Sequence, residues 1–509
     1  MNYVAGQRAT EIMNGFRWRW ALALLAAGIW FALVVGRVLT REPFIDEALY
    51  SLPAWNLANN GSMGSPVIET VGSPNPGWSI SPAGIRKHTY WMMPLPTVFL
   101  AGWYRLVGFS LFTTRMFTAV SMLAMLAAWY AILWRVSGDR TLSALGVLLI
   151  ASDAVLLTRA AWGRMDILSA AFGFSALAAY LNLRERSLGA AVAASQTLVV
   201  LAGLSHPNGG IVCGCGMLAV TLAFDARRLR WRHLAYAAVP YAAGAAAMGA
   251  YILQDRAAFM AQFFSQVGGR FDGLRSPLAA LRREPLRYAE AFGFGQTSRA
   301  KILICAAYLL AAARVCWDRP LRRKYGVLLV FGGAVVVSLA LFDNLKWSHY
   351  LVYTLPMFAA FVAIAVRAVP AGRWRSIAHA AAAVLICVQA GSVLRLIVAF
   401  NSYSAYVSAI RWIHSNVPRQ ALIMGDSSLY FDLGTTQLVD DIRLGYLTGK
   451  KADVVIVDGR YLDVFNYLRR DEPDAWRYID HYLRDECRAI PLSAGYTAYV
   501  PRTSLVRAP

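Results

Sequence analysis

The chain carries little charge, and little of that charge is negative. Only 16% of its 509 residues are Asp, Glu, Lys or Arg, and the 29 acids are outnumbered by 50 Lys and Arg. Soluble domains are about one quarter charged and about half apolar. At 58% apolar residues, the composition excludes an ordinary soluble enzyme and a disordered chain. We therefore expect a protein that crosses a membrane several times.

Cysteine and histidine are also scarce, at six and seven residues. The cysteines form no disulfide framework, and Cys213 and Cys215 have no His or Cys partner at zinc spacing. No internal repeat or low-complexity tract is visible. No glycine-rich phosphate loop follows the apolar run 454–457, and no small-residue cleavage site follows the first apolar run. We therefore expect no metal, no cofactor and no cleaved signal peptide.

Uncharged runs recur along most of the chain. Cutting the longest of them at the turn signal Pro207-Asn208-Gly209 gives eleven candidate spans. The runs are 21–36, 116–134, 141–158, 167–183, 187–224 (two spans), 234–254, 302–317, 325–342, 350–366 and 377–394. The fold class predicted is an all-α polytopic membrane bundle over residues 1–400.

The basic residues set the expected orientation. With the N-terminus in the cytoplasm, the turns near residues 135–140, 184–186, 227–232, 314–324 and 367–375 all face inward, as the positive-inside rule requires. These turns hold much of the +21 net charge, so no nucleic-acid partner is needed to explain it. The arrangement requires that 91–109 does not cross the membrane. We interpret it as an interfacial helix of a long first external loop, residues 40–112.

The tail differs in composition from the rest of the chain. Residues 401–509 contain repeated aspartates, and strand-like runs at 421–424, 454–457 and 496–500 alternate with helical patterns. They predict a small soluble α/β domain outside the membrane.

Ionisable side chains gather at the ends of the expected spans that face outward. Such residues are costly in or near a membrane, and they mark candidate functional sites. The set comprises Asp46, Glu47, Arg86, Lys87, His88, Arg115, Arg164, Asp166, His206, Lys346, His349 and Tyr350. Two acids and several bases on one surface can deprotonate a hydroxyl and bind a phosphate.

Four short motifs resemble the GT-C membrane glycosyltransferases, in the branch that contains the protein O-mannosyltransferases and the lipid A aminoarabinose transferase. They are the acidic pair Asp46-Glu47, the Pro-, Gly- and Arg-bearing run from Tyr90 to Arg115, the element Gly163-Arg164-Met165-Asp166, and the element from Lys346 through Tyr350 to Pro356. The resemblance covers residues 20–210 firmly and extends in patches to about 370. It does not reach the tail.

The resemblance implies an inverting transfer of a sugar from a polyprenyl-phosphate donor to an acceptor hydroxyl. Asp46 would be the general base, with Glu47 and Asp166 as further catalytic acids. Lys346, Arg115, Arg86 and Lys87 would hold the donor phosphate without a metal. His88 departs from the pattern, because five residues separate it from Pro94, whereas relatives often carry His or Lys directly before two prolines.

The expected location is the plasma membrane, with a cytoplasmic N-terminus and with the site and the tail outside. An Ala- and Arg-rich composition suggests a bacterium and an undecaprenyl carrier. Simpler explanations stay open: Asp46-Glu47 as a solvated helix start, Arg115 as a snorkelling side chain, Arg164 and Asp166 as a structural ion pair, and His206 as a turn cap. So do two other functions, a lipid or sugar transporter or flippase and a non-catalytic scaffold. The sequence names neither the sugar nor the acceptor.

Overall fold

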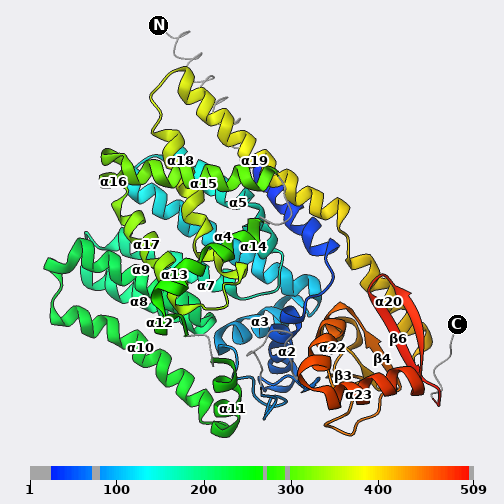
Figure 1. Ribbon diagram of the computed structural model, residues 1–509. Coiled ribbons are helices and arrows are strands. Elements are labelled where there is room, and N and C mark those ends of the chain that lie inside the picture. Colours follow the sequence, from blue (N-terminus) through cyan, green and yellow to red (C-terminus); the bar gives the residue numbers. More distant parts are fainter. Residues whose placement is uncertain (1–23, 71–80, 268–271, 293–298, 504–509) are drawn as a thin grey trace, which may run out of the picture.

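The structure, a computed structural model, describes residues 24–70, 81–267, 272–292 and 299–503. It consists of a large helical bundle with a small α/β domain at one end (Figure 1). The bundle contains the helix Leu24–Thr40, α4 (Leu111–Ser137), α5 (Arg140–Ser152), α6 (Ala154–Ala160), α7 (Asp166–Leu183), α8 (Leu188–Ser205), α9 (Pro207–Asp225), α10 (Trp231–Ile252), α15 (Arg299–Trp317), α17 (Gly326–Phe342), α18 (Leu355–Arg367) and α19 (Arg373–Ala399).

Each of the eleven candidate spans coincides with helix in its described part. The predicted fold class is therefore confirmed. By length and hydropathy, six of the described helices could cross a membrane, or nine if each bent pair is one span. The expected count of eleven is therefore higher than this measure supports. Of the two remaining runs, α17 has only 17 residues, and α15 carries the three basic residues Arg299, Lys301 and Arg314. The chain is a multi-pass membrane protein.

Polar residues cause the breaks between helices. His206 separates α8 from α9, as the turn signal predicted, and its ring accepts a hydrogen bond from the Asn208 backbone. Asp153 caps α6 and bends the pair α5 and α6 by 67°. The helix Leu24–Thr40 and α2 (Ile45–Asn60) meet at 93°, so α2 cannot continue the first span. α3 (Pro94–Val107) has 14 residues, about 21 Å of helix, too short for a core of about 30 Å.

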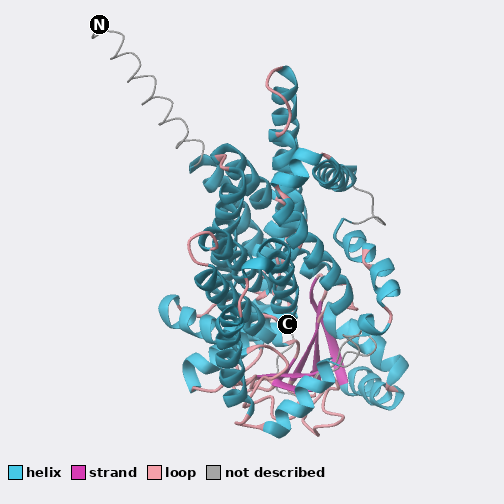
Figure 2. Cartoon of the chain, turned by 90° about the vertical axis from the view of Figure 1, so that its left-hand side faces the viewer, coloured by secondary structure: helices cyan, strands magenta, loops and turns pink. Residues whose placement is uncertain are grey.

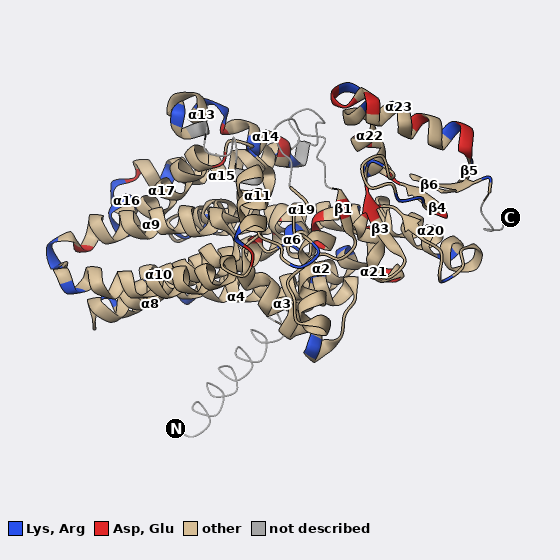
Figure 3. Ribbon diagram, turned by 90° about the horizontal axis from the view of Figure 1, so that it is seen from below, with Lys and Arg blue, Asp and Glu red and all other residues tan. Residues whose placement is uncertain are grey.

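Ion pairs join the basic turns to one another. Arg367 after α18 contacts Asp139 before α5 at 2.7 Å. Asp225 at the end of α9 contacts Arg184 at 3.1 Å and Arg228 at 2.8 Å. These turns therefore share one face, at the end of the bundle away from the α/β domain. Lys and Arg positions, blue in Figure 3, are frequent at that end of the ribbon. The shorter helices are α11 (Arg256–Val267), α12 (Asp272–Arg275), α13 (Pro277–Arg283), α14 (Pro285–Phe292), α16 (Arg319–Lys324), η1 (Ala226–Arg228) and η2 (Ser348–Tyr353).

The α/β domain is built on a six-stranded sheet, visible at one end of the helices in Figure 2. The strand order is β1-β3-β2-β4-β6-β5. The strands are β1 (Ile68–Thr70), β2 (Ile423–Met424), β3 (Leu438–Asp441), β4 (Val454–Val457), β5 (Cys487–Ser493) and β6 (Tyr496–Pro501). The helices are α20 (Tyr403–Asn416), α21 (Tyr430–Leu433), α22 (Gly459–Asp471) and α23 (Pro473–His481), with η3 (Ser427–Leu429) and the π-helical turn η4 (Tyr482–Glu486).

One strand of this sheet comes from the first loop, which the sequence did not predict. β1 pairs in parallel with β3, and the Thr70 hydroxyl donates to Asp441 at 2.6 Å. Glu69 on the same strand accepts from Lys450 at 2.6 Å. On α2, Ser51 accepts a hydrogen bond of 2.6 Å from Tyr430. The first loop and the α/β domain are therefore joined through backbone and side chains.

Close packing in the bundle depends on glycine at position 173. A Cβ there would lie 2.2 Å from the sulfur of Cys213, whereas a Cβ at Gly249 on α10 would meet nothing within 4 Å. Overpacking a tight core costs about 1–3 kcal/mol. We expect Gly173→Ala to lower the melting temperature in detergent, measured by tryptophan fluorescence, and the control Gly249→Ala to leave it unchanged. Equal melting temperatures would contradict this packing.

Candidate active site

Asp46 lies at the beginning of α2, where the chain has just turned away from the first helix. The Glu47 carboxylate accepts from the Phe44 backbone at 2.8 Å and thereby caps the helix. The neighbouring Asp46 side chain is 20% exposed and forms an ion pair with Arg164. Asp46 is therefore accessible, while the residue after it is buried.

A line of alternating charges continues from Asp46 into the bundle. Arg164 is 5% exposed and donates from Nε to Asp166 Oδ2 at 2.7 Å. His206 Nε2 lies 3.8 Å from Asp166 Oδ1. These residues come from α2, the turn before α7, α7 itself and the α8–α9 turn. The structure thus brings together four of the residues that the sequence singled out. Asp166 itself is buried and is in contact with Arg164.

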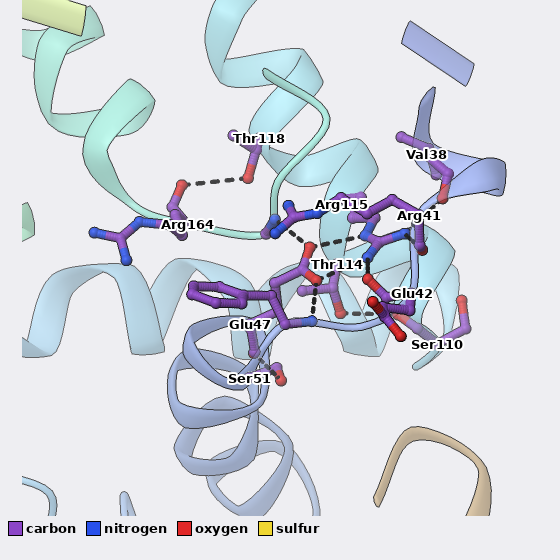
Figure 4. Close-up of polar contacts among 12 residues, drawn as sticks. Val38, Arg41, Glu42, Glu47, Ser51, Ser110, Thr114, Arg115, Thr118 and Arg164 are labelled. Atoms are coloured by element: carbon purple, nitrogen blue, oxygen red, sulfur yellow. Dashed lines mark hydrogen bonds and ion pairs between the residues drawn. The ribbon is translucent and has the colours of Figure 1, made fainter. Parts of the chain in front are cut away.

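Glu47 and Arg115 form a buried ion pair that is 0% exposed on both sides. Arg115 donates twice to Glu47, at 2.7 and 2.8 Å, and also to the backbone carbonyls of Val38, Arg41 and Glu42 (Figure 4). A guanidinium with all these acceptors has no donor left for a phosphate. The predictions of Arg115 as a phosphate ligand and of Glu47 as a catalytic acid do not fit this geometry, which makes both structural.

Gly163 explains how the ion pair positions the site. Its backbone N–H donates to Glu47 at 2.8 Å, and a Cβ at this position would lie 2.7 Å from a methyl group of Thr114. Glu47 accepts a hydrogen bond from Gly163, and the residues adjacent to these two in the sequence, Asp46 and Arg164, form an ion pair. The two adjacent contacts hold the turn before α7 against the start of α2.

A cavity of about 810 Å³ opens beside Asp46, between the bundle and the α/β domain. From the bundle and the first loop it is lined by Arg41, Asp46, Arg164, His206, His349 and Tyr350, among others. From the α/β domain it is lined by Asp426, Ser428, Asp458, Arg460, Asp463 and Tyr496, among others. Its size is that of a small-molecule site. Residues that are far apart in the sequence, from Arg41 to Tyr496, therefore line one cavity.

The other cations predicted to hold phosphate are engaged elsewhere. Lys346 is buried, and its ammonium donates to the Ala340 carbonyl at 2.5 Å and pairs with Glu284 at 3.2 Å. Arg86 is 60% exposed and pairs with Glu69 at 2.6 Å. Lys87 is exposed, and His88 stacks on Tyr90. None of these four is among the described residues that line the cavity. A short motif gives the order of residues but does not show which way a side chain points, so it could not place these side chains relative to the cavity.

Two arginines that the sequence analysis did not single out lie near the site: Arg41 lines the cavity, and Arg159, which is not among the described lining residues, shares Trp162 with it. The guanidinium of Arg41 stacks on Trp162 at 3.7 Å, and that of Arg159 stacks on Trp162 at 3.9 Å. Within the described part of the chain, Arg41 Nη1 and Arg159 Nε and Nη1 are buried and have no hydrogen-bond partner. His349, whose ring packs on Trp162 at 5.5 Å, likewise has a buried, unpartnered Nδ1. Buried donors without acceptors are costly unless a ligand satisfies them.

The opposite wall of the cavity is acidic. Asp426, Asp440 and Asp458 lie at the carboxyl ends of β2, β3 and β4, which run parallel and therefore end at one edge of the sheet. Arg460 contacts Asp426 at 2.5 Å and Asp440 at 3.0 Å. Burial, and next the charge of Asp426, raise the pKa of Asp458 to about 7.

Comparison with known proteins gives the fold. No family model and no curated protein matches the sequence, but 16 solved chains match the structure. The crystal structure of ArnT from Cupriavidus metallidurans bound to undecaprenyl phosphate aligns with a TM-score of 0.63 at 13% identity, over 97% of this chain and 99% of that chain. ArnT in the apo state gives 0.58 at 14% identity, over 97% and 100%.

The archaeal oligosaccharyltransferase AglB from Archaeoglobus fulgidus, in complex with an inhibitory peptide and a dolichol-phosphate, gives 0.50 at 14% identity, over 95% of this chain and 75% of that chain. The resemblance to the GT-C membrane transferases that the four motifs suggested is thus confirmed at the level of the fold. At these identities the likeness extends no further than the fold.

The buried ion pair generates a prediction. Removing one partner of such a pair leaves an uncompensated buried charge and costs about 3–5 kcal/mol. We expect Glu47→Ala to unfold the protein or to lower its melting temperature strongly, because Arg115 and the Gly163 N–H both lose their acceptor. Thermal melting and size-exclusion profiles in detergent measure the effect. The control, Asp471→Ala, removes an acid that pairs with Arg470 on the exposed surface of α22. A stable Glu47→Ala variant would contradict the structural role.

Proposed function

We propose that this chain, which has the fold of the GT-C membrane glycosyltransferases, is an inverting glycosyltransferase that uses a polyprenyl-phosphate sugar as donor. The observation that carries the proposal is the convergence of an accessible carboxylate, Asp46, and an unsatisfied guanidinium, Arg41, on one cavity. A base and a cation are what the reaction needs at its two ends. ArnT, which shares the fold, is known bound to undecaprenyl phosphate.

Asp46 would accept the proton of the acceptor hydroxyl. The acceptor oxygen attacks the anomeric carbon of the donor, the bond from that carbon to the phosphate oxygen breaks, and the configuration inverts. Arg164 holds Asp46 in place through their ion pair. Asp166 and His206 orient Arg164 in turn. Asp166 therefore acts as a positioning residue in this proposal.

The leaving group is a lipid monophosphate, whose charge increases as the bond breaks. Arg41, which lines the cavity, offers it a buried N–H donor that no described acceptor uses. Arg159 is not among the described lining residues, but it has unused buried donors on the other side of Trp162 and adds positive charge there. Stacking on Trp162 fixes both guanidinium planes before the phosphate arrives. Charge-assisted hydrogen bonds of this kind supply the stabilisation, so we propose a transfer that does not depend on a metal.

The location of the basic turns supports an active site outside the cytoplasm. They lie at the end of the bundle away from the α/β domain (Figure 3), and that domain lines the cavity. Basic turns remain on the cytoplasmic side, so we place the cavity and the α/β domain at the outer face of the plasma membrane, with the N-terminus inside.

Replacing the base should abolish transfer while the fold persists. Asp46→Asn keeps the size of the side chain and a partial acceptor for Arg164 but cannot take a proton. We expect the rate of transfer to fall by about 10²–10⁴-fold, with the melting temperature within a few degrees of the wild type. Envelope lipids and glycans from cells with and without the gene, compared by mass spectrometry, identify the product to be assayed. Asp471→Asn, an exposed aspartate on α22, is the matched control. Unchanged transfer in Asp46→Asn would remove Asp46 as the base.

Replacing Arg41, the arginine proposed to bind the phosphate, should weaken lipid binding. Hydrogen bonds to charged groups contribute about 1.5–3 kcal/mol, so Arg41→Ala should weaken undecaprenyl phosphate binding by about 10–100-fold. Arg86→Ala is the control, because Arg86 is exposed and lies outside the cavity lining. Binding to the full chain in nanodiscs is measured by native mass spectrometry. The opposite ranking of the two variants would contradict the assignment.

A further inference from the structure

We propose that the α/β domain forms the acceptor half of the cavity and that its acidic wall selects an uncharged or amino-bearing carbohydrate hydroxyl and rejects a phosphorylated one. The inference rests on the proposed function, since it names the substrate class of the same site. It is carried by a difference between the two halves of the cavity: the bundle half contains a buried guanidinium donor without a described acceptor, in Arg41, whereas the lining of the α/β half is acidic and its arginine, Arg460, is already paired.

The half formed by the bundle is suited to an anion. Arg41 and Arg164 line it together with the acids Glu42, Asp46 and Glu290, and Arg164 is paired with Asp46. The buried Arg41 Nη1 and His349 Nδ1 have no partner among the described residues. Trp162, between Arg41 and Arg159, keeps the guanidinium groups oriented. The donor phosphate therefore has a place here, beside Asp46, and the acceptor must approach from the other side.

The half formed by the α/β domain is suited to hydroxyl and amino groups. Asp426, Asp458 and Asp463 line it, with a single cation, Arg460. That cation is already paired with Asp426 and with Asp440 behind it, so it offers an anion little. Carboxylates accept hydrogen bonds from hydroxyls and attract ammonium groups, whereas they repel a like charge such as a phosphate.

Neutral polar and aromatic groups complete this half. Ser402, Ser404 and Ser428 contribute hydroxyls to the lining, and Tyr496 contributes an aromatic ring. Tyr496 also donates to Glu42 at 3.1 Å. Hydroxyls and carboxylates around an aromatic face match a sugar ring, which has polar edges and apolar C–H faces.

The acidic wall is fixed relative to Asp46 at three points. β1 of the first loop is a strand of the domain's sheet, Thr70 binds Asp441, and Tyr430 donates to Ser51 on the helix that carries Asp46. The acceptor-facing residues thus keep one distance from the base. A phosphate group on the acceptor would meet the carboxylates whenever its hydroxyl reached Asp46.

Three probes that differ in one substituent test the selectivity: methyl β-cellobioside, its 6′-amino-6′-deoxy derivative and its 6′-phosphate. Their binding to the full chain in nanodiscs is measured by calorimetry, with undecaprenyl phosphate present. We expect the phosphate to bind at least tenfold more weakly than the neutral probe, and the amine at least as tightly. The double variant Asp458→Asn with Asp463→Asn should reduce the phosphate penalty to less than threefold.

The variant is chosen to preserve the fold. Asp458 caps α22 by accepting from the Tyr461 N–H at 2.9 Å, and asparagine caps equally well. Asp463 is exposed on the same helix, and Asp471→Asn, also exposed on α22 but outside the cavity lining, is the control that should keep the full penalty. Melting temperatures confirm that each variant is folded.

Equal affinities for the three probes, no binding of any of them, or a penalty that survives the double variant would each overturn the inference. The proposed function is judged separately: undecaprenyl phosphate binding that Arg41→Ala weakens and the double variant does not would leave it standing even then.

Discussion

The ion pair between Glu47 and Arg115 is the contact on which the rest of the site depends. It joins the start of α2 to α4 inside a membrane protein, where no water is available to replace either partner. The same carboxylate binds the turn before α7 through Gly163. Asp46 and Arg164 meet because the residues beside them are held. The buried pair thus positions the accessible pair of Asp46, the base we propose, and Arg164.

The cavity follows from this arrangement. The chain bends by 93° between the helix Leu24–Thr40 and α2, and the first residues of α2 line the cavity beside the α/β domain. The domain closes that space because the first loop supplies a strand to its sheet. The unpartnered donor of Arg41 and the acidic residues of the α/β domain then lie on different walls of one cavity, with Asp46 also in its lining. This order suits a transfer in which one substrate is a phosphate and the other is not.

Hydropathy predicted the helices well, because apolar runs in a membrane have few alternatives to helix. The turn at Pro207, the basic face and the non-spanning segment that became α3 were also predictable. Strand β1 was not, since three residues form a strand only when a partner edge is present. Of the residues that the sequence singled out for the site, Asp46, Arg164, His206, His349 and Tyr350 line the cavity, whereas Arg115 and Lys346 are not among its described lining residues. Arg41, which also lines it, was not singled out, because a motif gives the order of residues but not the direction of a long side chain.

A cryo-electron microscopy structure of the full chain with undecaprenyl phosphate is the most direct test of the central claim, that Asp46 and the arginines stacked on Trp162 serve one reaction centre. The account predicts the lipid phosphate within hydrogen-bond distance of the Arg41 or Arg159 guanidinium, on the bundle side of the cavity beside Asp46. A phosphate bound at Lys346 or at Arg86, with Arg41 and Arg159 in the contacts they have without it, would contradict the claim.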